Sequence, residues 1–202
     1  LQAVANGDSL PVLRFYRWQP AAVTLGYAQS VVTDLDLEVC RQAGIDVVRR
    51  STGGRAVLHD NELTYSVIAP LNSALFGHSV LACYRVIPEV FQKTLVQSGF
   101  PAQLVPGKSR GGSQNAMKAI CFSAPSQYEL VIDGRKVAGS AQKRHGQAFL
   151  QHGSIPVAMD LELLGKALKT RADDGADSLK TVGWLNQWSD RPIHIPDLEK
   201  MM

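Results

Sequence analysis

Long apolar runs, paired cysteines and clustered histidines are all missing from this chain of 202 residues. No apolar run approaches the roughly 18 residues that a membrane span needs, so we expect no transmembrane helix and no membrane partner. The cysteines, which are Cys40, Cys83 and Cys121, include no C-x-x-C pair, which argues against a disulfide framework and against a zinc site. The five histidines form no closely spaced pair, so we expect no bound metal. This cysteine usage fits a reducing cytoplasm.

A strong net charge is missing as well. The formal net charge is +3, which is too small to indicate a nucleic-acid-binding protein. The distribution is less even, because residues 134–152 contain no acidic residue but include Arg135, Lys136, Lys143 and Arg144. Such a stretch is commonly a pair of solvated basic strands, and composition alone favours that interpretation. The alternative is a docking surface for an acidic protein.

The length of the chain suits one domain with a full hydrophobic core, so we expect residues 1–202 to form a single domain. The sequence begins at Leu1 without a methionine, and it stops at Met202 inside a segment with a structured pattern. We therefore expect further residues at both ends.

Runs rich in β-branched and aromatic residues predict strands in the first third of the chain. Residues 12–18 and 21–27 are separated by Gln19-Pro20, a turn signal, so we expect a hairpin or two adjacent strands. Residues 45–50 predict a strand that runs into a glycine-rich loop. Residues 55–59 and 62–70 predict antiparallel strands around Asp60-Asn61. The second of these has the two-residue period of a half-buried strand, with Leu63, Tyr65, Val67 and Ala69 on one face.

Helical patterns and one turn signal complete the expected fold. Residues 33–44 predict a short helix with Thr33 or Asp34 as N-cap and Gly44 as C-cap. A longer helix, kinked or restarted at Pro88, is indicated by an apolar stripe of Val80, Tyr84, Ile87, Phe91 and Leu95.

The pair Asp133-Gly134 predicts a two-residue hairpin turn, because both positions need positive φ. Residues 147–157 predict a strand, and residues 160–170, capped by Asp160, and 177–188 predict helices. These elements together predict an α+β domain with a mixed, largely antiparallel sheet flanked by helices.

The loop after residues 45–50 is the first candidate for chemistry. Gly53 and Gly54 allow a tight turn that presents backbone N–H groups to an acyl or phosphate oxygen, and Arg50 and Arg55 bracket them with positive charge. The alternative, at roughly even odds, is an ordinary Gly-Gly turn with solvated arginines. His59 taken alone is more often a structural histidine than a catalytic base.

Cys121 and Lys136 are the second candidate. A lone cysteine is more often a core residue than a nucleophile. Cys121, however, lies near several basic residues, and a nearby cation lowers the pKa of a thiol and supplies the reactive thiolate. Lys136 follows a tight turn and can orient a carbonyl or move protons if it faces a pocket. The alternative is that Arg135 and Lys136 are ordinary exposed hairpin residues, and Cys40 and Cys83 look like packing residues.

Several motifs together resemble the biotin/lipoate protein ligase family. They are "LGYAQ" at residues 25–29, "RRSTGGRAVLHDNELTYSV" at 49–67, "CFSAPSQYELVIDGRKVAGSAQKR" at 121–144 and "LQHGSI" at 150–155. The match is closest to the cysteine-dependent octanoyltransferases of lipoate synthesis. The ATP-using ligases tend to carry a third glycine where Arg55 stands and Gly-Asn where Glu62-Leu63 stands, and often an asparagine in place of Ser30.

The resemblance implies the biotin/lipoyl ligase-type α+β catalytic domain, and it assigns the nucleophile to Cys121 and the family's lysine to Lys136. It implies no cofactor, because a thioester drives amide formation without ATP. Val57, Leu58 and Tyr65 are expected to line a slot for the acyl chain. The substrate-binding residues that it implies are Arg50, Thr52, Gly53, Gly54, Arg55, Ala56, His59, Gly139, Ser140, Ala141, His152 and Gly153.

The resemblance also implies partners. The donor would be octanoyl-acyl carrier protein, the acceptor a lysine of a lipoyl domain or of the glycine-cleavage H protein, and the enzyme a monomer. Three alternatives stay open: an ATP-dependent lipoate–protein ligase, an amidotransferase that moves octanoyl between lipoyl-domain proteins, and a non-catalytic acyl-binding domain.

Overall fold

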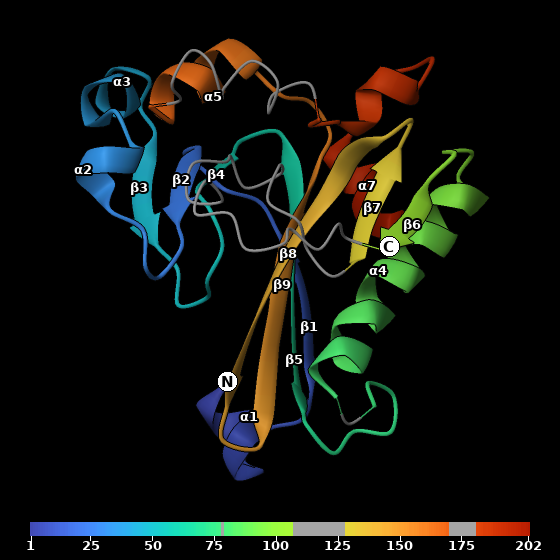
Figure 1. Ribbon diagram of the computed structural model, residues 1–202. Coiled ribbons are helices and arrows are strands. Elements are labelled where there is room, and N and C mark those ends of the chain that lie inside the picture. Colours follow the sequence, from blue (N-terminus) through green and yellow to red (C-terminus); the bar gives the residue numbers. More distant parts are fainter. Residues whose placement is uncertain (78, 107–127, 170–180) are drawn as a thin grey trace.

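The computed structural model describes residues 1–77, 79–106, 128–169 and 181–202. Its described strands form two sheets (Figure 1). The larger sheet has six strands in the order β1 (Val12–Tyr16), β5 (Glu62–Pro70), β9 (Ala148–Pro156), β8 (Arg135–His145), β7 (Tyr128–Ile132) and β6 (Gln103–Pro106), and all its pairs are antiparallel. The smaller sheet has the order β3 (Asp46–Arg49), β2 (Ala22–Leu25) and β4 (Val57–His59), with a parallel β2–β3 pair and an antiparallel β2–β4 pair.

Helices flank the sheets, as predicted. The long helix α4 (Val80–Gln97) runs beside the larger sheet, and α2 (Val31–Asp34), α3 (Leu37–Gln42) and α5 (Leu161–Ala167) lie around the smaller one (Figure 1). The remaining described helices are α1 (Gln2–Asn6), the 3-10 helix η3 (Leu185–Trp188) and α7 (Ile195–Met201). No helix among the described residues is long and apolar enough to cross a membrane.

Each sheet has its own core. Alternate residues of β5 (Leu63, Tyr65, Val67 and Ala69) are buried with Phe91 and Leu95 of α4, as the two-residue and helical periods predict. The core of the smaller sheet joins Val23 and Leu25 of β2 to Leu164 of α5 and to Cys40 of α3. Cys40 and Cys83 are both free and buried, which confirms them as packing residues.

Local signals predicted several elements correctly. The β7–β8 hairpin turns at Asp133 (φ 46°) and Gly134 (φ 74°), both in the left-handed region. The side chain of Asp160 caps α5 by accepting a hydrogen bond from the backbone N–H of Leu163. Helix α4 forms as the apolar stripe predicts, but it continues through Pro88, so the alternative of a restart there was wrong.

Other predictions were wrong. The strands at 12–18 and 21–27 are not adjacent, because β1 pairs with β5 whereas β2 pairs with β3 and β4. Strands β4 and β5 likewise belong to different sheets, so Asp60-Asn61 joins the sheets and does not close a hairpin.

The helix predicted at 33–44 is two short helices. The second is capped by Asp36, whose carboxylate accepts hydrogen bonds from two backbone N–H groups, and it ends at Gln42 with Ala43, not Gly44, as its C-cap. Of the helix predicted at 177–188, residues 181–188 form a β-bridge at Val182 and the 3-10 helix.

Candidate active site

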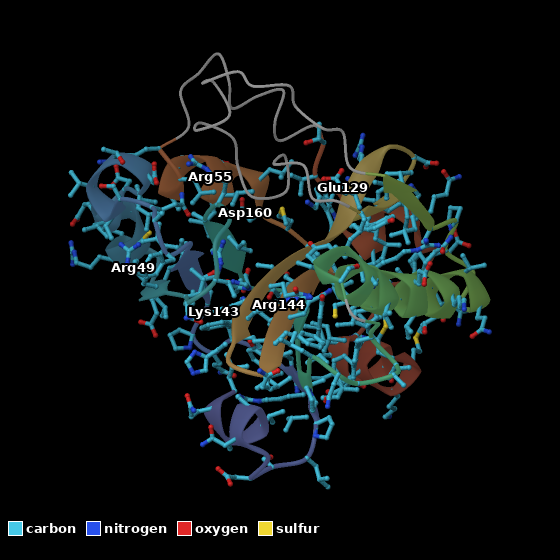
Figure 2. The ribbon with its side chains drawn as sticks, turned by 60° about the horizontal axis from the view of Figure 1, so that its bottom comes forward. Arg49, Arg55, Glu129, Lys143, Arg144 and Asp160 are labelled. Atoms are coloured by element: carbon cyan, nitrogen blue, oxygen red, sulfur yellow. The ribbon has the colours of Figure 1, made fainter. Side chains whose placement is uncertain are left out.

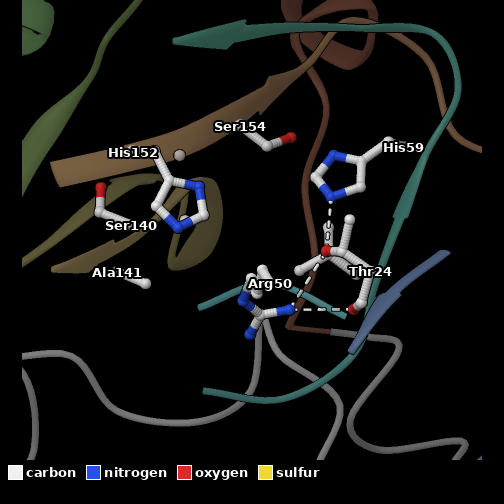
Figure 3. Close-up of a pocket in the computed structure, with 10 residues that line it drawn as sticks. Thr24, Arg50, His59, Ser140, Ala141, His152 and Ser154 are labelled. Carbon is white, nitrogen blue, oxygen red and sulfur yellow. Dashed lines mark hydrogen bonds between the residues drawn. The ribbon is translucent and has the colours of Figure 1, made fainter. Parts of the chain in front are cut away.

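Two adjoining cavities lie where the smaller sheet meets the larger one. The narrow cavity, about 30 Å³, is lined from β2 and β4 on one side and from β8 and β9 on the other (Figure 3). The wider cavity, about 270 Å³, shares Thr24, Arg50, His59 and His152 with it. Its other walls are Tyr16, Trp18, Val48, Ser51, Thr64, Ser66 and Leu150.

The structure brings many of the predicted substrate-binding residues to the narrow cavity, namely Arg50, His59, Gly139, Ser140, Ala141, His152 and Gly153. The remaining predicted residues, Thr52, Gly53, Gly54, Arg55 and Ala56, are not among its lining residues. The hydroxyl of Thr52 lies 2.7 Å from Nε2 of His152, and Ala56 is buried in the core of the smaller sheet. Arg55 pairs with Asp34 at 3.9 Å. Cys121 lies outside the described residues.

The guanidinium of Arg50 joins the glycine-rich loop to strand β2 through hydrogen bonds. Toward the part of the chain that the structure describes, it donates five hydrogen bonds: two to the backbone oxygen of Gly53, one to that of Arg55, and two to the backbone and side-chain oxygens of Thr24, at 2.6–3.3 Å. A guanidinium carries five N–H groups, so each one has a protein acceptor. The simple alternative of a solvated arginine is wrong for Arg50.

The glycine-rich loop packs against the segment that follows β2. A Cβ atom on Gly26 would lie 2.0 Å from the backbone oxygen of Gly54, so only glycine fits at position 26 without a backbone shift. Gly54 itself has φ 96°, in the left-handed region. The side chain of Gln29 accepts a hydrogen bond of 3.0 Å from the Gly26 N–H. The short motif from Gly26 to Gln29 therefore packs directly against the glycine-rich loop at Gly54.

Strands β8 and β9 approach each other closely at the other wall. A Cβ on Gly153 would lie 2.1 Å from the backbone oxygen of Gly139 and 2.7 Å from Cε1 of Tyr65. The Tyr65 hydroxyl lies 2.6 Å from Oγ of Ser140, and burial raises the pKa of this tyrosine.

The expected acyl slot is only partly lined as predicted. Val57 faces the narrow cavity. Leu58 packs in the core of the smaller sheet, because successive residues of a strand point to opposite faces. The ring of Tyr65 is buried in the core of the larger sheet and does not line either cavity. The sequence reasoning missed Tyr16, Trp18, Val48 and Leu150, which line the wider cavity.

His152 lines both cavities, and its imidazole is uncharged at neutral pH. Burial, reinforced by the nearby charge of Arg50, lowers its pKa to about 4. An uncharged imidazole can orient a polar substrate group through a hydrogen bond without adding a positive charge.

A buried polar network includes three residues that line the narrow cavity, Thr24, His59 and Ser154. Thr24 Oγ1 lies 2.8 Å from Nε2 of His59, and Nδ1 of His59 lies 2.6 Å from a carboxylate oxygen of Glu62. Thr64 and Ser154 also donate to Glu62. The His59 ring stacks on Trp18 at 4.8 Å between centroids. His59 is thus satisfied within the protein, as expected of a structural histidine, whereas Glu62 was not predicted to belong to the site.

Lys136 is buried, so the interpretation of an exposed hairpin lysine is wrong for it, although Arg135 is exposed. Its Nζ lies 3.3 Å from a carboxylate oxygen of Glu129 on β7. Its backbone is held on the other side by residues 181–183, through hydrogen bonds of 2.8 Å to Thr181 and 2.9 Å from Gly183. Lys136 is absent from the lining of both cavities.

The sequence is similar to known enzymes of lipoate metabolism. The sequence model described as "Lipoyl protein ligase A/B catalytic domain" matches residues 1–202. The octanoyltransferase LipM of Carboxydothermus hydrogenoformans is 37% identical, over 99% of this chain and 75% of its own length. LipM of Exiguobacterium sp. is 46% identical, over 80% of this chain and 59% of its own length. LipM of Clostridioides difficile is 44% identical, over 85% of this chain and 63% of its own length. The chain thus spans about three fifths of two of these relatives.

Solved structures show the same fold. A lipoate-protein ligase A bound with ATP superposes with a TM-score of 0.74 at 24% identity, over 99% of this chain and 74% of its own. A bipartite lipoate protein ligase from Thermoplasma acidophilum, solved in a study that includes its E2 lipoyl domain, gives 0.73 at 24% identity, over 99% of this chain and 72% of its own. At this identity the likeness establishes the fold.

Proposed function

The chain belongs to the lipoyl protein ligase A/B catalytic domain family, and we propose that it is an octanoyltransferase of lipoate biosynthesis. The observation that carries the proposal is its identity of 37–46% with octanoyltransferases, which is well above its 24% identity with the structurally similar ligases. We also propose that residues 1–202 work as one domain. Support comes from the path of the chain, since α5 follows β9 of the larger sheet and packs into the core of the smaller one.

The proposed reaction has two half-reactions. The thiolate of Cys121 attacks the thioester carbonyl of octanoyl-acyl carrier protein, and the carrier thiol leaves with a proton. The ε-amine of an acceptor lysine then attacks the octanoyl–Cys121 thioester. An amide forms, the Cys121 thiolate departs, and the amine loses a proton. Neither half-reaction needs ATP or a metal.

The proposed roles of the individual groups come from the family resemblance. Lys136 orients the acyl carbonyl and helps to move protons, and its burial beside Glu129 suits a positioned ammonium group. Backbone N–H groups of Gly53, Gly54 and Gly139 stabilise the oxyanion. Thr52 holds His152 at the cavity wall.

The wider cavity is proposed to hold the eight-carbon chain. Its volume of about 270 Å³ lies near the lower limit of the 300–1,000 Å³ that is typical of small-ligand sites, and it is lined by Tyr16, Trp18, Val48 and Leu150. The narrow cavity beside it, between Val57 and Gly139–Ala141, would receive the thioester end.

Basic side chains suit the proposed partners. Lys143 and Arg144 lie on β8, and Arg49 and Arg55 lie on the side of the smaller sheet (Figure 2). We propose that this charge attracts an acidic carrier protein and then a lipoyl domain or the H protein, with the enzyme acting as a monomer in the reducing cytoplasm. Positive charge near the site should raise the association rate more than the affinity.

An ATP-dependent ligase is the second candidate, favoured by the structural likeness to a lipoate-protein ligase bound with ATP. The test is transfer of octanoate to a purified lipoyl domain. An octanoyltransferase uses octanoyl-acyl carrier protein without ATP and loses activity on Cys121→Ser. A ligase uses free octanoate or lipoate, requires ATP and tolerates that substitution. An amidotransferase would instead need the octanoylated H protein as its donor.

A further inference from the structure

The hydrogens of the buried network can be placed by counting donors and acceptors. Arg50 can only donate, so the Thr24 hydroxyl oxygen accepts its hydrogen bond of 3.1 Å. The Glu62 carboxylate can only accept, so it fixes the His59 hydrogen on Nδ1, and Nε2 then accepts the hydrogen of the Thr24 hydroxyl over 2.8 Å. His59 donates its Nδ1 hydrogen to Glu62 over 2.6 Å.

The other partners of Glu62 donate in the same direction. The indole of Trp18 can only donate, so the Thr64 hydroxyl accepts from it over 3.0 Å and gives its own hydrogen to Glu62 over 2.6 Å. Ser154, opposite Thr64 in the β5–β9 register, donates to the second carboxylate oxygen. Glu62, 2% exposed, is thus a buried carboxylate that accepts three hydrogens.

This arrangement changes the chemistry of the cavity walls. Thr24, His59 and Ser154 line the narrow cavity, yet each directs its polar hydrogen away from it. Arg50 lines both cavities, and all five of its N–H groups already have protein acceptors. Among the described residues that line the narrow cavity, Thr24, Arg50, His59 and Ser154 therefore direct their polar hydrogens to protein acceptors, and His152 and Ser140 are its other polar side chains.

We propose that Glu62 is a positioning residue that sets acyl-chain specificity near the thioester end, because it draws the hydrogens of His59 and Ser154 away from the narrow cavity, which the first carbons of an unsubstituted chain would enter. The inference rests on the proposed octanoyl transfer. A chain of the same length with a hydroxyl on carbon 3 would lose its hydrogen bonds to water on entering the narrow cavity and would gain no donor from Thr24, His59 or Ser154.

The substitution Glu62→Gln tests the role of the carboxylate by changing one atom. The glutamine oxygen can still accept from His59 and Thr64, but its NH₂ group faces Ser154 and must donate. The Ser154 hydroxyl then turns its hydrogen toward the cavity. This substitution should therefore introduce one donor into the wall at an identified position.

The assay compares kcat/KM for octanoyl thioesters with and without a hydroxyl at carbon 3, and a hydroxyl at carbon 8, which would lie in the wider cavity, serves as the control donor. The wild type should prefer the plain chain by about 100-fold, the limit for rejecting an added hydroxyl in an apolar pocket. Glu62→Gln should reduce this preference to about tenfold for the carbon-3 donor and should leave the kcat/KM ratio for the carbon-8 donor unchanged. The double variant Glu62→Gln, Ser154→Ala should restore the preference. Glu38→Gln on the exposed surface of α3 is the matched control and should leave it unchanged.

A loss of the same factor for every donor in Glu62→Gln would overturn the proposal, since it would show a purely structural role. The second readout is the histidine tautomer in side-chain ¹⁵N–¹H spectra, with the His59 signals identified by their loss in His59→Asn. Neutral His59 with its hydrogen on Nδ1 supports the network, even if Glu62→Gln fails to fold or the wild type transfers no acyl group at all. A hydrogen on Nε2 overturns it. Absence of transfer from every donor would refute the proposed function alone.

Discussion

Lowering the pH should destabilise the protein through His152. An ordinary histidine has a pKa of 6.5, whereas burial and the charge of Arg50 lower the pKa of His152 to about 4. Between these values the unfolded chain binds a proton and the folded protein does not. The stability present above pH 6.5 is therefore lost as the pH falls toward 4. The cost is about 2 kcal/mol at pH 5 and approaches about 3 kcal/mol below pH 4.

Urea unfolding of the wild type and of His152→Gln, at pH 7.5 and at pH 5, measures this effect. Subtracting the two pH dependences removes the contribution of every other titrating group. The wild type should lose about 2 kcal/mol more than the variant between the two pH values. His145→Gln, at the exposed end of β8, is the matched control and should behave as the wild type. Equal losses in the wild type and in His152→Gln would refute the explanation by burial.

Four further substitutions test other parts of the account. Gly153→Ala should lower the free energy of unfolding by about 3 kcal/mol, measured in urea, because its Cβ would lie 2.1 Å from the backbone oxygen of Gly139; an unchanged midpoint would contradict the close approach. Lys136→Met should lower octanoyl transfer by at least about 100-fold in a protein that still folds by circular dichroism, and near-normal transfer would remove Lys136 from the mechanism. Gly134→Ala should cost about 1 kcal/mol in thermal unfolding, because its φ is 74°, whereas Gly53→Ala, with no atom within 4 Å of the added Cβ, should cost less.

Features fixed by near neighbours could be predicted from the sequence. The Asp133-Gly134 turn depends on two residues that tolerate positive φ, and α4 depends on a stripe within one helix. Strand pairing could not be predicted in the same way. Residues 12–16 and 22–25 are close in sequence, but they join different sheets because their partners lie far along the chain.

The candidate site divides in the same manner. Motif residues such as Arg50, Gly139 and His152 were expected at the site, and the structure brings them to one cavity. Glu62 was noted only as a departure from the ligase pattern. Its role depends on Ser154, 92 residues away, and on a tautomer that only the assembled network determines. A charged residue at the start of an otherwise buried strand was the available signal.

The central claim is tested most directly by the intact mass of the protein after incubation with octanoyl-acyl carrier protein in the absence of ATP. The account predicts a hydroxylamine-labile octanoyl adduct on the wild type and none on Cys121→Ser. Absence of an adduct on both proteins, with transfer of octanoate or lipoate appearing only after ATP is added, would contradict it and identify an ATP-dependent ligase.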